Sequence, residues 1–328
     1  MRAWLLDSQT GLGALRLADV PDPVPADGQA ILSIHYAGLN PADRYLAQGE
    51  YPARPKWPHI LGRDGLGTVI AVGAGSNVAV GSKMIILRGE TGVSAPGTFA
   101  EKVAVSAADL VAIPAGWTDQ QAAGAPLVYL TAWQALTCWE DLPRPAVVLV
   151  TGASGGVGVA SVQLAKAMGH TVVALSRDSA KRKRLIELGA RIVLDPAADW
   201  AAQLRTALSG GRVDLAIDNI GGEQFSRLLE TLGDHGRISC VGRLAGEVPR
   251  FNTASLFFRR LRVGGVYVGA YGSAGGRDAW NRVVAMLAGA GSVPLVDSVF
   301  EFARLPEAFE RLAAGPMGKV LLSVPGAV

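Results

Sequence analysis

The spacing of hydrophobic and polar residues differs between two parts of the chain. Up to about Gln121, short strand-like runs such as 30–34 and 68–72 are separated by clusters of glycine, proline and asparagine. That texture predicts a compact, mostly β domain. After Gln121, apolar strands such as 191–194 and 213–217 alternate with helical segments. This alternation predicts a doubly wound parallel sheet.

The last part of the chain returns to shorter elements. Beyond Val268 the pattern predicts a helix at 278–288, a β segment at 296–302, a second helix and a closing strand at 319–324. We assign this tail to the first domain. The predicted boundaries are therefore 1–121 for the first segment of the β domain, 122–267 for the nucleotide-binding domain, and 268–328 for the second segment of the β domain.

One strand-turn-helix stretch has the pattern of a dinucleotide site. A β-branched apolar run at 147–150 leads into a turn that contains Gly152, Gly155 and Gly158, and a second strand follows at 171–175. Glycines at this spacing let the chain reverse, bring backbone N–H groups to a pyrophosphate and let the helix pack closely on the strand. The spacing alone also fits an ordinary tight turn. The strands and helix around it favour cofactor binding.

The residues that end the second strand of this unit select the cofactor. Ser176 and Arg177 stand there, and Lys181 follows one helical turn later. Hydrogen-bond donors at these positions suit the 2′-phosphate of NADP(H), whereas a carboxylate would accept hydrogen bonds from the ribose hydroxyls of NAD(H). Asp178 leaves the second alternative open. If Asp178 occupies the ribose position, the basic run up to Arg184 is only a solvated helix face.

Composition narrows the class of protein. The chain of 328 residues is 49% hydrophobic and 18% charged, which allows two cores and excludes a disordered chain. Its 31 basic and 28 acidic residues give a net charge of +3. That excess is too small to indicate binding to nucleic acid or to a membrane surface. Two cysteines exclude a disulfide framework, and the first residues lack an apolar signal core, so we expect a cytoplasmic protein.

Six segments carry a family resemblance: AGLNPADRY at 37–45, HILGRDGLGTVIAVG at 59–73, PLVYLTAWQAL at 126–136, GASGGVG at 152–158, DNIGG at 218–222 and GKVLL at 318–322. They resemble the medium-chain dehydrogenase/reductase superfamily, and within it the zinc-free quinone oxidoreductase and enoyl reductase branch. The resemblance covers nearly the whole chain. It implies an α/β fold in which a Rossmann doubly wound parallel sheet is inserted in a mostly-β GroES-like catalytic domain.

The resemblance also implies which residues face the cofactor and the acceptor. Matching cofactor-binding positions are Thr131, Gly152, Ser154, Gly155, Gly156, Val157, Asn219, Val241, Gly242, Val266, Val268 and Lys319. Candidate catalytic residues are Asn40, Asp43, Tyr45 and Tyr51, and Tyr51 matches the tyrosine that enoyl thioester reductases use as a donor. Plain structural roles stay open for several of them: a helix cap for Thr131, an edge charge for Lys319, and half-buried aromatic rings for the two tyrosines.

The chain departs from the metal-dependent members of that superfamily. Asn40 stands where their cysteine ligand would be, and Gly62-Arg63-Asp64 replaces their Gly-His-Glu element. The guanidinium of Arg63 is a permanent cation where a neutral imidazole would bind zinc. We therefore predict no metal site.

Without a Lewis acid, reduction of an already electrophilic acceptor is favoured over alcohol oxidation. We expect an NADPH-dependent reductase that acts on a small quinone or conjugated enone, with Arg54 and Lys56 supplying positive charge beside Tyr51. The alternatives are an enoyl-thioester reductase, a zinc-free alcohol dehydrogenase and a non-catalytic NADPH-binding protein. Family members commonly pair through an edge strand of the Rossmann sheet. The apolar segment 261–268 is the candidate edge, so we expect a homodimer.

Overall fold

The computed structural model of the protein describes residues 1–87, 89–246 and 250–325. It divides into two compact units. The first comprises Met1–Leu127, Tyr271–Asn281 and Val293–Val328, and the second comprises Val128–Ala270 and Arg282–Ser292. The expected fold class is confirmed, because the first unit is a GroES-like β domain and the second is a parallel-sheet Rossmann domain.

The first unit contains two sheets whose paired strands are antiparallel, except for the parallel pair β15 and β16. A seven-stranded sheet has the order β15-β16-β3-β5-β6-β8, with β7 also paired to β3, and a three-stranded sheet has the order β2-β1-β4. The strands are β1 (Arg2–Leu6), β2 (Leu15–Asp19), β3 (Gln29–Gly38), β4 (His59–Ile60), β5 (Asp64–Val72), β6 (Lys83–Ile86), β7 (Lys102–Ser106), β8 (Leu110–Ala112), β15 (Val296–Glu301) and β16 (Lys319–Ser323). The helices are α1 (Pro41–Ala47), α2 (Asp119–Gly124) and α10 (Leu305–Ala313).

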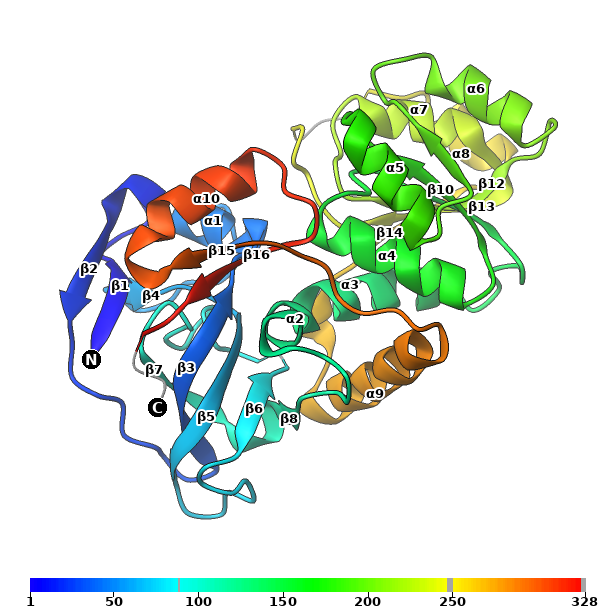
Figure 1. The fold of residues 1–328 in the computed structure, drawn as a ribbon. Helices are drawn as coiled ribbons and strands as arrows, with labels where there is room; N and C mark the ends of the chain where they lie inside the picture. Colours follow the sequence, from blue (N-terminus) through cyan, green and yellow to red (C-terminus); the bar gives the residue numbers. More distant parts are fainter. Residues whose placement is uncertain (88, 247–249, 326–328) are drawn as a thin grey trace. The chain divides into compact units, whose positions relative to one another are not determined.

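The end of the chain is part of the first unit's sheet. In Figure 1, β16, coloured red, lies beside β3, coloured blue, and the register pairs Leu321 with Gly38 and Leu322 with Ala37. The apolar run Val320–Leu322 is fully buried. Its contribution to the core is the reason that a segment so distant in sequence completes this sheet.

Helix α10 covers this core with one apolar stripe. Leu305, Ala308 and Phe309 have the i, i+3, i+4 spacing of a single helix face, and all three are buried. The ring of Phe309 meets that of Phe99 edge to face, with centroids 5.9 Å apart. The indole of Trp4 donates a hydrogen bond to the Phe302 carbonyl at 2.9 Å, which ties β1 to the turn before α10.

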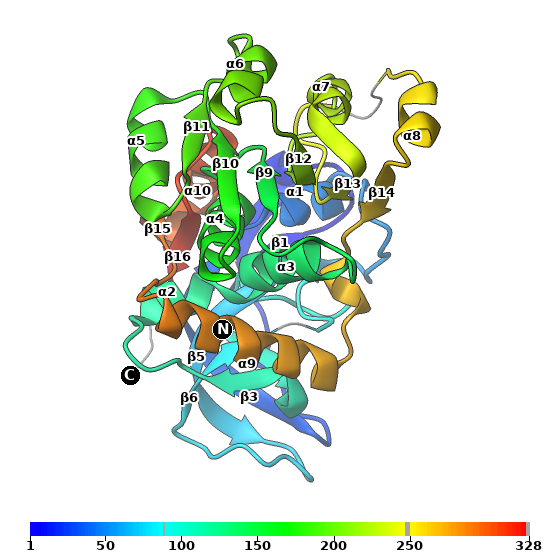
Figure 2. The same ribbon diagram turned by 90° about the vertical axis from the view of Figure 1, so that its right-hand side faces the viewer.

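The second unit is a six-stranded sheet in which all neighbouring strands are parallel, with the order β11-β10-β9-β12-β13-β14 (Figure 2). Its strands are β9 (Val147–Val150), β10 (Thr171–Leu175), β11 (Ile192–Leu194), β12 (Val213–Asp218), β13 (Leu232–Cys240) and β14 (Arg262–Gly265). The connecting helices are α4 (Gly156–Ala167), α5 (Ser179–Leu188), α6 (Trp200–Ala207), α7 (Gln224–Thr231) and α8 (Ala254–Phe258). Helices α3 (Pro126–Thr137) and α9 (Ser273–Gly289) contribute residues to both units.

The strand order reverses between β9 and β12. In sheets of this kind, ligands bind beyond the carboxyl ends of the strands at such a reversal. The glycine turn after β9 and the DNIGG segment after β12 therefore lie at the expected position for a ligand. Within the described ranges, no helix combines the length and the apolar character needed to cross a membrane.

Candidate functional site

The turn after β9 leaves backbone N–H groups open at the start of α4. Gly152 has a φ of 55°, and a Cβ added at Gly158 would lie 2.3 Å from the Gly152 carbonyl oxygen, so both positions require glycine. Gly155 precedes the helix and provides no side-chain cap. Ser154 and Val157 are partly exposed. A helix N-terminus of this kind fits a pyrophosphate, because uncapped N–H groups and the helix dipole both favour a negative charge.

Ser176, Arg177 and Asp178, which follow β10, have different environments in the structure. The carboxylate of Asp178 accepts a hydrogen bond from the Lys181 backbone N–H at 2.9 Å and caps α5. This hydrogen bond holds the pKa of Asp178 below its ordinary value. Ser176 is buried at the strand end, and Arg177 is exposed. Asp178 thus has a structural role, which favours Ser176 and Arg177 as the residues that meet the ribose end of a cofactor.

Arg182 supports this segment in a way that sequence reasoning missed. Its Nη1 donates to the carbonyl oxygens of Ser176 and Arg177 at 2.9 and 2.8 Å, and it forms an ion pair with Asp195 at 3.0 Å. These contacts fix the backbone on which Ser176 and Arg177 are carried. The available signal was a basic residue six positions after Ser176. In the sequence it could not be distinguished from the other cations of α5.

The DNIGG segment after β12 is held to the end of β9. Asn219 donates from Nδ2 to the Thr151 carbonyl at 2.8 Å, and the Thr151 hydroxyl donates to Asp218 Oδ1 at 2.8 Å. The same carboxylate accepts hydrogen bonds from the backbone N–H groups of Ile220 and Gly221. The predicted cofactor residue Asn219 therefore uses one amide N–H to join the two strand ends.

The remaining cofactor candidates of the second unit lie near the same strand ends. The backbone N–H groups of Val241 and Gly242 both donate to the Asp218 carbonyl. Val266 donates to the Cys240 carbonyl just beyond β14, and Val268 begins a short 3₁₀ helix. Thr131 lies in α3 and is buried. The structure thus groups Val241 and Gly242 with Asn219, whereas the role of Thr131 stays a prediction.

Two candidate residues of the first unit, Asn40 and Lys319, form one buried polar network with Asp64. The Lys319 ammonium donates to Asn40 Oδ1 at 2.7 Å, to Asp64 Oδ2 at 2.9 Å and to the Leu39 carbonyl at 2.9 Å. Asn40 in turn donates from Nδ2 to Asp64 Oδ2 at 2.9 Å, and Asp64 Oδ1 accepts from the Leu127 backbone N–H at 3.1 Å. All three side chains are at most 4% exposed. The network fixes the orientation of the Asn40 amide and occupies the three donors of Lys319.

A second group beside it contains Asp43, Arg63 and Tyr51. Asp43 accepts a hydrogen bond from the Asn40 backbone N–H at 2.8 Å and lies 3.5 Å from Arg63 Nε. Burial raises the pKa of Asp43 to about 6, against the opposing effect of the Arg63 charge. The Arg63 guanidinium carbon lies 4.2 Å from the centre of the Tyr51 ring. The catalytic candidates Asp43 and Tyr51 are thus linked through Arg63.

The structure places a further arginine, Arg63, beside Tyr51. Arg54 donates from Nη1 to the backbone carbonyl oxygens of Tyr51 and Ala53, so its guanidinium caps the loop. The cation over the tyrosine ring is Arg63. The other candidate tyrosine, Tyr45, is in α1 and has the Arg44 guanidinium 5.6 Å from its ring centre.

The polar network of the first unit does not fit a zinc ion. Asn40 and Asp64 already bind the Lys319 ammonium, and the Arg63 guanidinium adds a second fixed cation. Positive charges in these places oppose a divalent cation. Among the residues that the structure describes, no three His, Cys, Asp or Glu side chains form a group that could hold a metal ion.

Two family models match the chain, in the order expected from its fold. Residues 26–115 match the alcohol dehydrogenase GroES-like domain, and residues 156–289 match the zinc-binding dehydrogenase model. The quinone oxidoreductase of Pongo abelii is 25% identical over 98% of this chain and 97% of its own length. The acryloyl-coenzyme A reductase of Sulfurisphaera tokodaii is 29% identical over 76% of this chain and 80% of its own length.

Larger proteins also contain a similar segment. The polyketide synthase GfsB of Streptomyces halstedii is 31% identical over 92% of this chain, which corresponds to 5% of that protein's length. Among solved structures, mycobacterial Rv1454c complexed with NADPH superposes with a TM-score of 0.88 at 27% identity, covering 98% of this chain and 99% of that one. The sequence motifs, the two matched domains and the shared fold show that this chain belongs to the medium-chain dehydrogenase/reductase superfamily of oxidoreductases.

Proposed function

We propose that the protein is an NADPH-dependent, zinc-independent reductase that transfers hydride to a quinone or a conjugated enone. The observation that carries this proposal is the buried network of Lys319, Asn40 and Asp64, in which an ammonium group is bound by Asn40, the residue at the position that resembles the metal-binding cysteine. An enzyme without that Lewis acid is poorly equipped to oxidise an alcohol, and an electrophilic acceptor needs less activation. The match to a quinone oxidoreductase over nearly its full length supports this substrate class.

The second unit offers the features that a nicotinamide dinucleotide needs. The open N–H groups before α4 fit the pyrophosphate, and Ser176 and Arg177 fit a 2′-phosphate. The structural neighbour Rv1454c, 27% identical, was solved with NADPH, which also supports this choice of cofactor. The bound dihydronicotinamide would supply the hydride, and the protein would position the acceptor and stabilise the charge that forms on it.

A second candidate function is reduction of an enoyl thioester. It is favoured by Tyr51, whose phenol can donate a proton, and by the similarity to an acryloyl-coenzyme A reductase and to polyketide synthases. Oxidation of NADPH, measured with a panel of quinones, small enones and enoyl thioesters, distinguishes the two. The highest kcat/KM on quinones or enones supports the first function. A clear preference for enoyl thioesters supports the second, and NADPH binding without turnover on any acceptor contradicts both.

We expect the purified protein to hold no stoichiometric zinc and to retain its activity in excess chelator. The physical reason is the pair of fixed cations, Lys319 and Arg63, at the positions in question. Elemental analysis of the protein, combined with the reductase assay before and after chelation, measures both properties. One zinc ion per chain, with activity lost on its removal, would show that the prediction is wrong.

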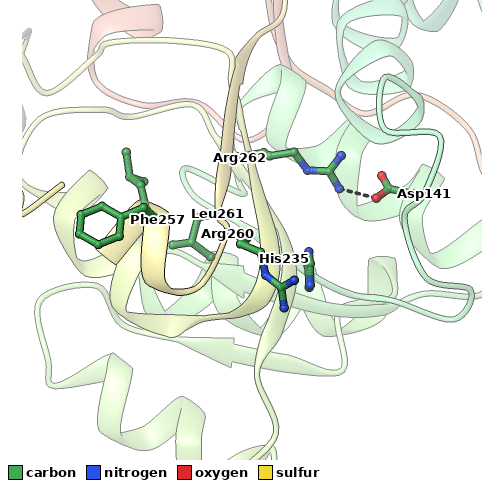
Figure 3. Close-up of a pocket in the computed structure, with 7 residues that line it drawn as sticks. Asp141, His235, Phe257, Arg260, Leu261 and Arg262 are labelled. Carbon is green, nitrogen blue, oxygen red and sulfur yellow. Dashed lines mark hydrogen bonds and ion pairs between the residues drawn. The ribbon is translucent and has the colours of Figure 1, made fainter. Parts of the chain in front are cut away.

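We also propose that the protein forms a homodimer through the β14 edge of the Rossmann sheet. Among the described residues, β14 pairs on one side only, with β13. Val263 on this strand is 44% exposed, and Phe257 and Phe258 on α8 are 63% and 79% exposed. The adjoining hollow has a volume of about 600 Å³. Figure 3 shows Phe257 and Leu261 among its lining residues and Arg262 joined to Asp141. An open strand edge beside exposed aromatic rings is suited to a second copy of the chain.

Sedimentation of the purified protein tests this arrangement. The wild type is expected to sediment as a dimer at micromolar concentration, and Val263→Lys is expected to shift it toward a monomer, because a lysine on the edge strand opposes pairing. Exposed Val24, which belongs to the first unit, provides a matched control as Val24→Lys. A monomeric wild type would refute the proposal.

A further inference from the structure

Arg63 is a buried arginine whose position is fixed by its backbone. It precedes β5 and is only 8% exposed. The residue before it, Gly62, has a φ of 99°, and a Cβ there would lie 2.5 Å from the Thr98 hydroxyl. Thr98 also donates from this hydroxyl to the Asp64 carbonyl at 2.8 Å. The backbone that carries Arg63 is therefore held in place, and its guanidinium is positioned by Ala42, Asp43 and the Tyr51 ring.

The hydrogen bonds of Arg63 leave one end of its guanidinium unused. A guanidinium has five N–H donors. Nη2 donates to the Ala42 carbonyl over a long 3.3 Å, and Nε lies 3.5 Å from Asp43 without forming a hydrogen bond. The face of the group is covered by the Tyr51 ring. Nη1 forms no hydrogen bond with any described residue. Unlike Nε, it is not fully enclosed by protein atoms, so it reaches accessible space.

The charge of Arg63 is also incompletely neutralised. Asp43, the carboxylate with which it forms an ion pair, is fully buried, and burial raises the pKa of that carboxyl to about 6 even though Arg63 is beside it. The 3.5 Å separation and the raised pKa together describe a loose ion pair. The neighbouring Asp64 carboxylate is bound to Lys319, Asn40 and the Leu127 backbone N–H. A desolvated guanidinium with an unused edge is a strong site for a negatively charged oxygen.

We propose that Arg63 is a catalytic residue that binds the carbonyl oxygen of the acceptor and stabilises the negative charge developing on it during reduction. This inference rests on the proposed reductase function. It names Arg63 as the group that stabilises the negative charge on the acceptor oxygen, as a metal ion would do in a metal-dependent enzyme. Tyr51, stacked on the same guanidinium, would be held next to the oxygen that Arg63 binds. One site would then combine a fixed positive charge with a proton donor.

With an enone, the bound NADPH would supply a hydride from C4 of its dihydronicotinamide, with the electron pair of the C–H bond, and a new C–H bond would form at the β-carbon of the acceptor. The C=C electrons would move to form the enolate, whose oxygen would accept a hydrogen bond from an N–H of Arg63. NADPH is oxidised to NADP⁺ and the enone is reduced by two electrons. The Tyr51 phenol would then transfer its proton to the α-carbon, and water would reprotonate the phenolate. For a quinone, the product is the hydroquinone monoanion, which takes its proton from water.

Two substitutions and a matched control test the role of Arg63 in turnover. Arg63→Met removes the charge and is expected to lower kcat/KM by roughly 10²-fold on both enones and quinones, the usual scale for loss of one oxyanion donor. Arg63→Lys keeps the charge without the planar fork and is expected to recover roughly a tenth of wild-type activity. The Kd for NADPH should stay unchanged in both. The control is Arg311→Met, which removes a bidentate ion pair to Asp297 in the same unit and should leave the acceptor kinetics unchanged.

A binding measurement separates this inference from the proposed function. The probe is para-nitrophenolate, a stable anion that resembles a hydroquinone monoanion, titrated against the NADP⁺ complex by its visible absorbance. The Kd is expected to rise at least roughly tenfold in Arg63→Met and less in Arg63→Lys, with Arg311→Met unchanged. If Arg63→Met does not fold, the Lys variant still has to show weaker binding and lower turnover.

The possible outcomes are distinct. Nitrophenolate affinity that depends on Arg63 in a protein that reduces no acceptor would support the anion site and refute the reductase function. Two results would overturn the inference while leaving the reductase function intact: a kcat/KM of the Arg63 variants within about threefold of the wild-type value, or an unchanged affinity of Arg63→Met for nitrophenolate.

Discussion

Replacing Tyr51 with phenylalanine is expected to lower kcat on enones and enoyl thioesters by about 10²-fold or more, with nearly unchanged affinity for NADPH. The phenol O–H is the proton donor in the proposed mechanism, and loss of one general acid commonly has an effect of this size. The substitution is specific, because a phenylalanine ring can still stack on the Arg63 guanidinium. Steady-state kinetics with NADPH, together with a cofactor titration, measure both quantities.

Quinone reduction by the same variant provides an internal control. A reduced quinone oxygen can take its proton from water, so the loss on quinones should be much smaller than the loss on enones. An equal and small loss on both acceptors would identify Tyr51 as a packing residue. We would then abandon the proton-donor role, and with it the enoyl-thioester alternative, and retain positioning by the bound cofactor as the main source of rate.

The fold was predictable where the sequence signal is local. The apolar run 147–150, the glycine turn and the strand that follows are neighbours in sequence, and the structure has β9, α4 and β10 there. The tail 268–328 was assigned to the first unit, and Tyr271–Asn281 and the strands β15 and β16 are part of it, whereas Arg282–Ser292 belongs to the second unit. The segment predicted as an edge strand, 261–268, is shorter in the structure: β14 ends at Gly265 and Val268 is in a 3₁₀ helix.

The cluster around Arg63 was not predictable, because its contacts join positions that are far apart in sequence. Lys319 reaches Asp64 across 255 residues, and no local pattern indicates that its three donors are used inside the protein. The sequence assigned Arg63 only a negative role, as a cation that excludes zinc. Its stacking on Tyr51 depends on how the loop between α1 and β4 folds, and this loop has no periodicity to interpret. The nearer cation in sequence, Arg54, also lies beside Tyr51, but its guanidinium donates to the Tyr51 and Ala53 carbonyls, whereas that of Arg63 lies over the Tyr51 ring.

The choice of cofactor was left open by the sequence and is narrowed by one hydrogen bond. Ser176, Arg177 and Asp178 are consecutive, and a shift of one or two residues in register changes which side chain meets the ribose. Capping of α5 by Asp178 ties that carboxylate to the Lys181 backbone. Capping preferences of aspartate were visible in the sequence. The sequence did not show that the helix begins at Ser179, with Asp178 as its N-cap.

Replacing Arg177 with alanine is expected to weaken NADPH binding by roughly 1.5 to 3 kcal/mol, which is about 10- to 150-fold in Kd, and to change NADH binding far less. The guanidinium of Arg177 is exposed at the end of β10 and carries no hydrogen bond from its side chain to any described residue, so it is free to pair with a phosphate. Its backbone is held by Arg182, which should keep the loop in place when the side chain is removed. Titration of both cofactors, followed by protein fluorescence, gives the two dissociation constants.

Arg184→Ala is the matched control for this prediction. Arg184 is an exposed cation in the same basic run and forms an ion pair with Glu187, one helical turn away. If general positive charge attracted the cofactor, both variants would weaken NADPH and NADH alike, and the effect would fade with added salt. A direct contact with the 2′-phosphate instead confines the loss to Arg177→Ala and to NADPH. Equal loss for the two cofactors in Arg177→Ala would contradict the assignment and return the basic run of α5 to the role of a solvated helix face.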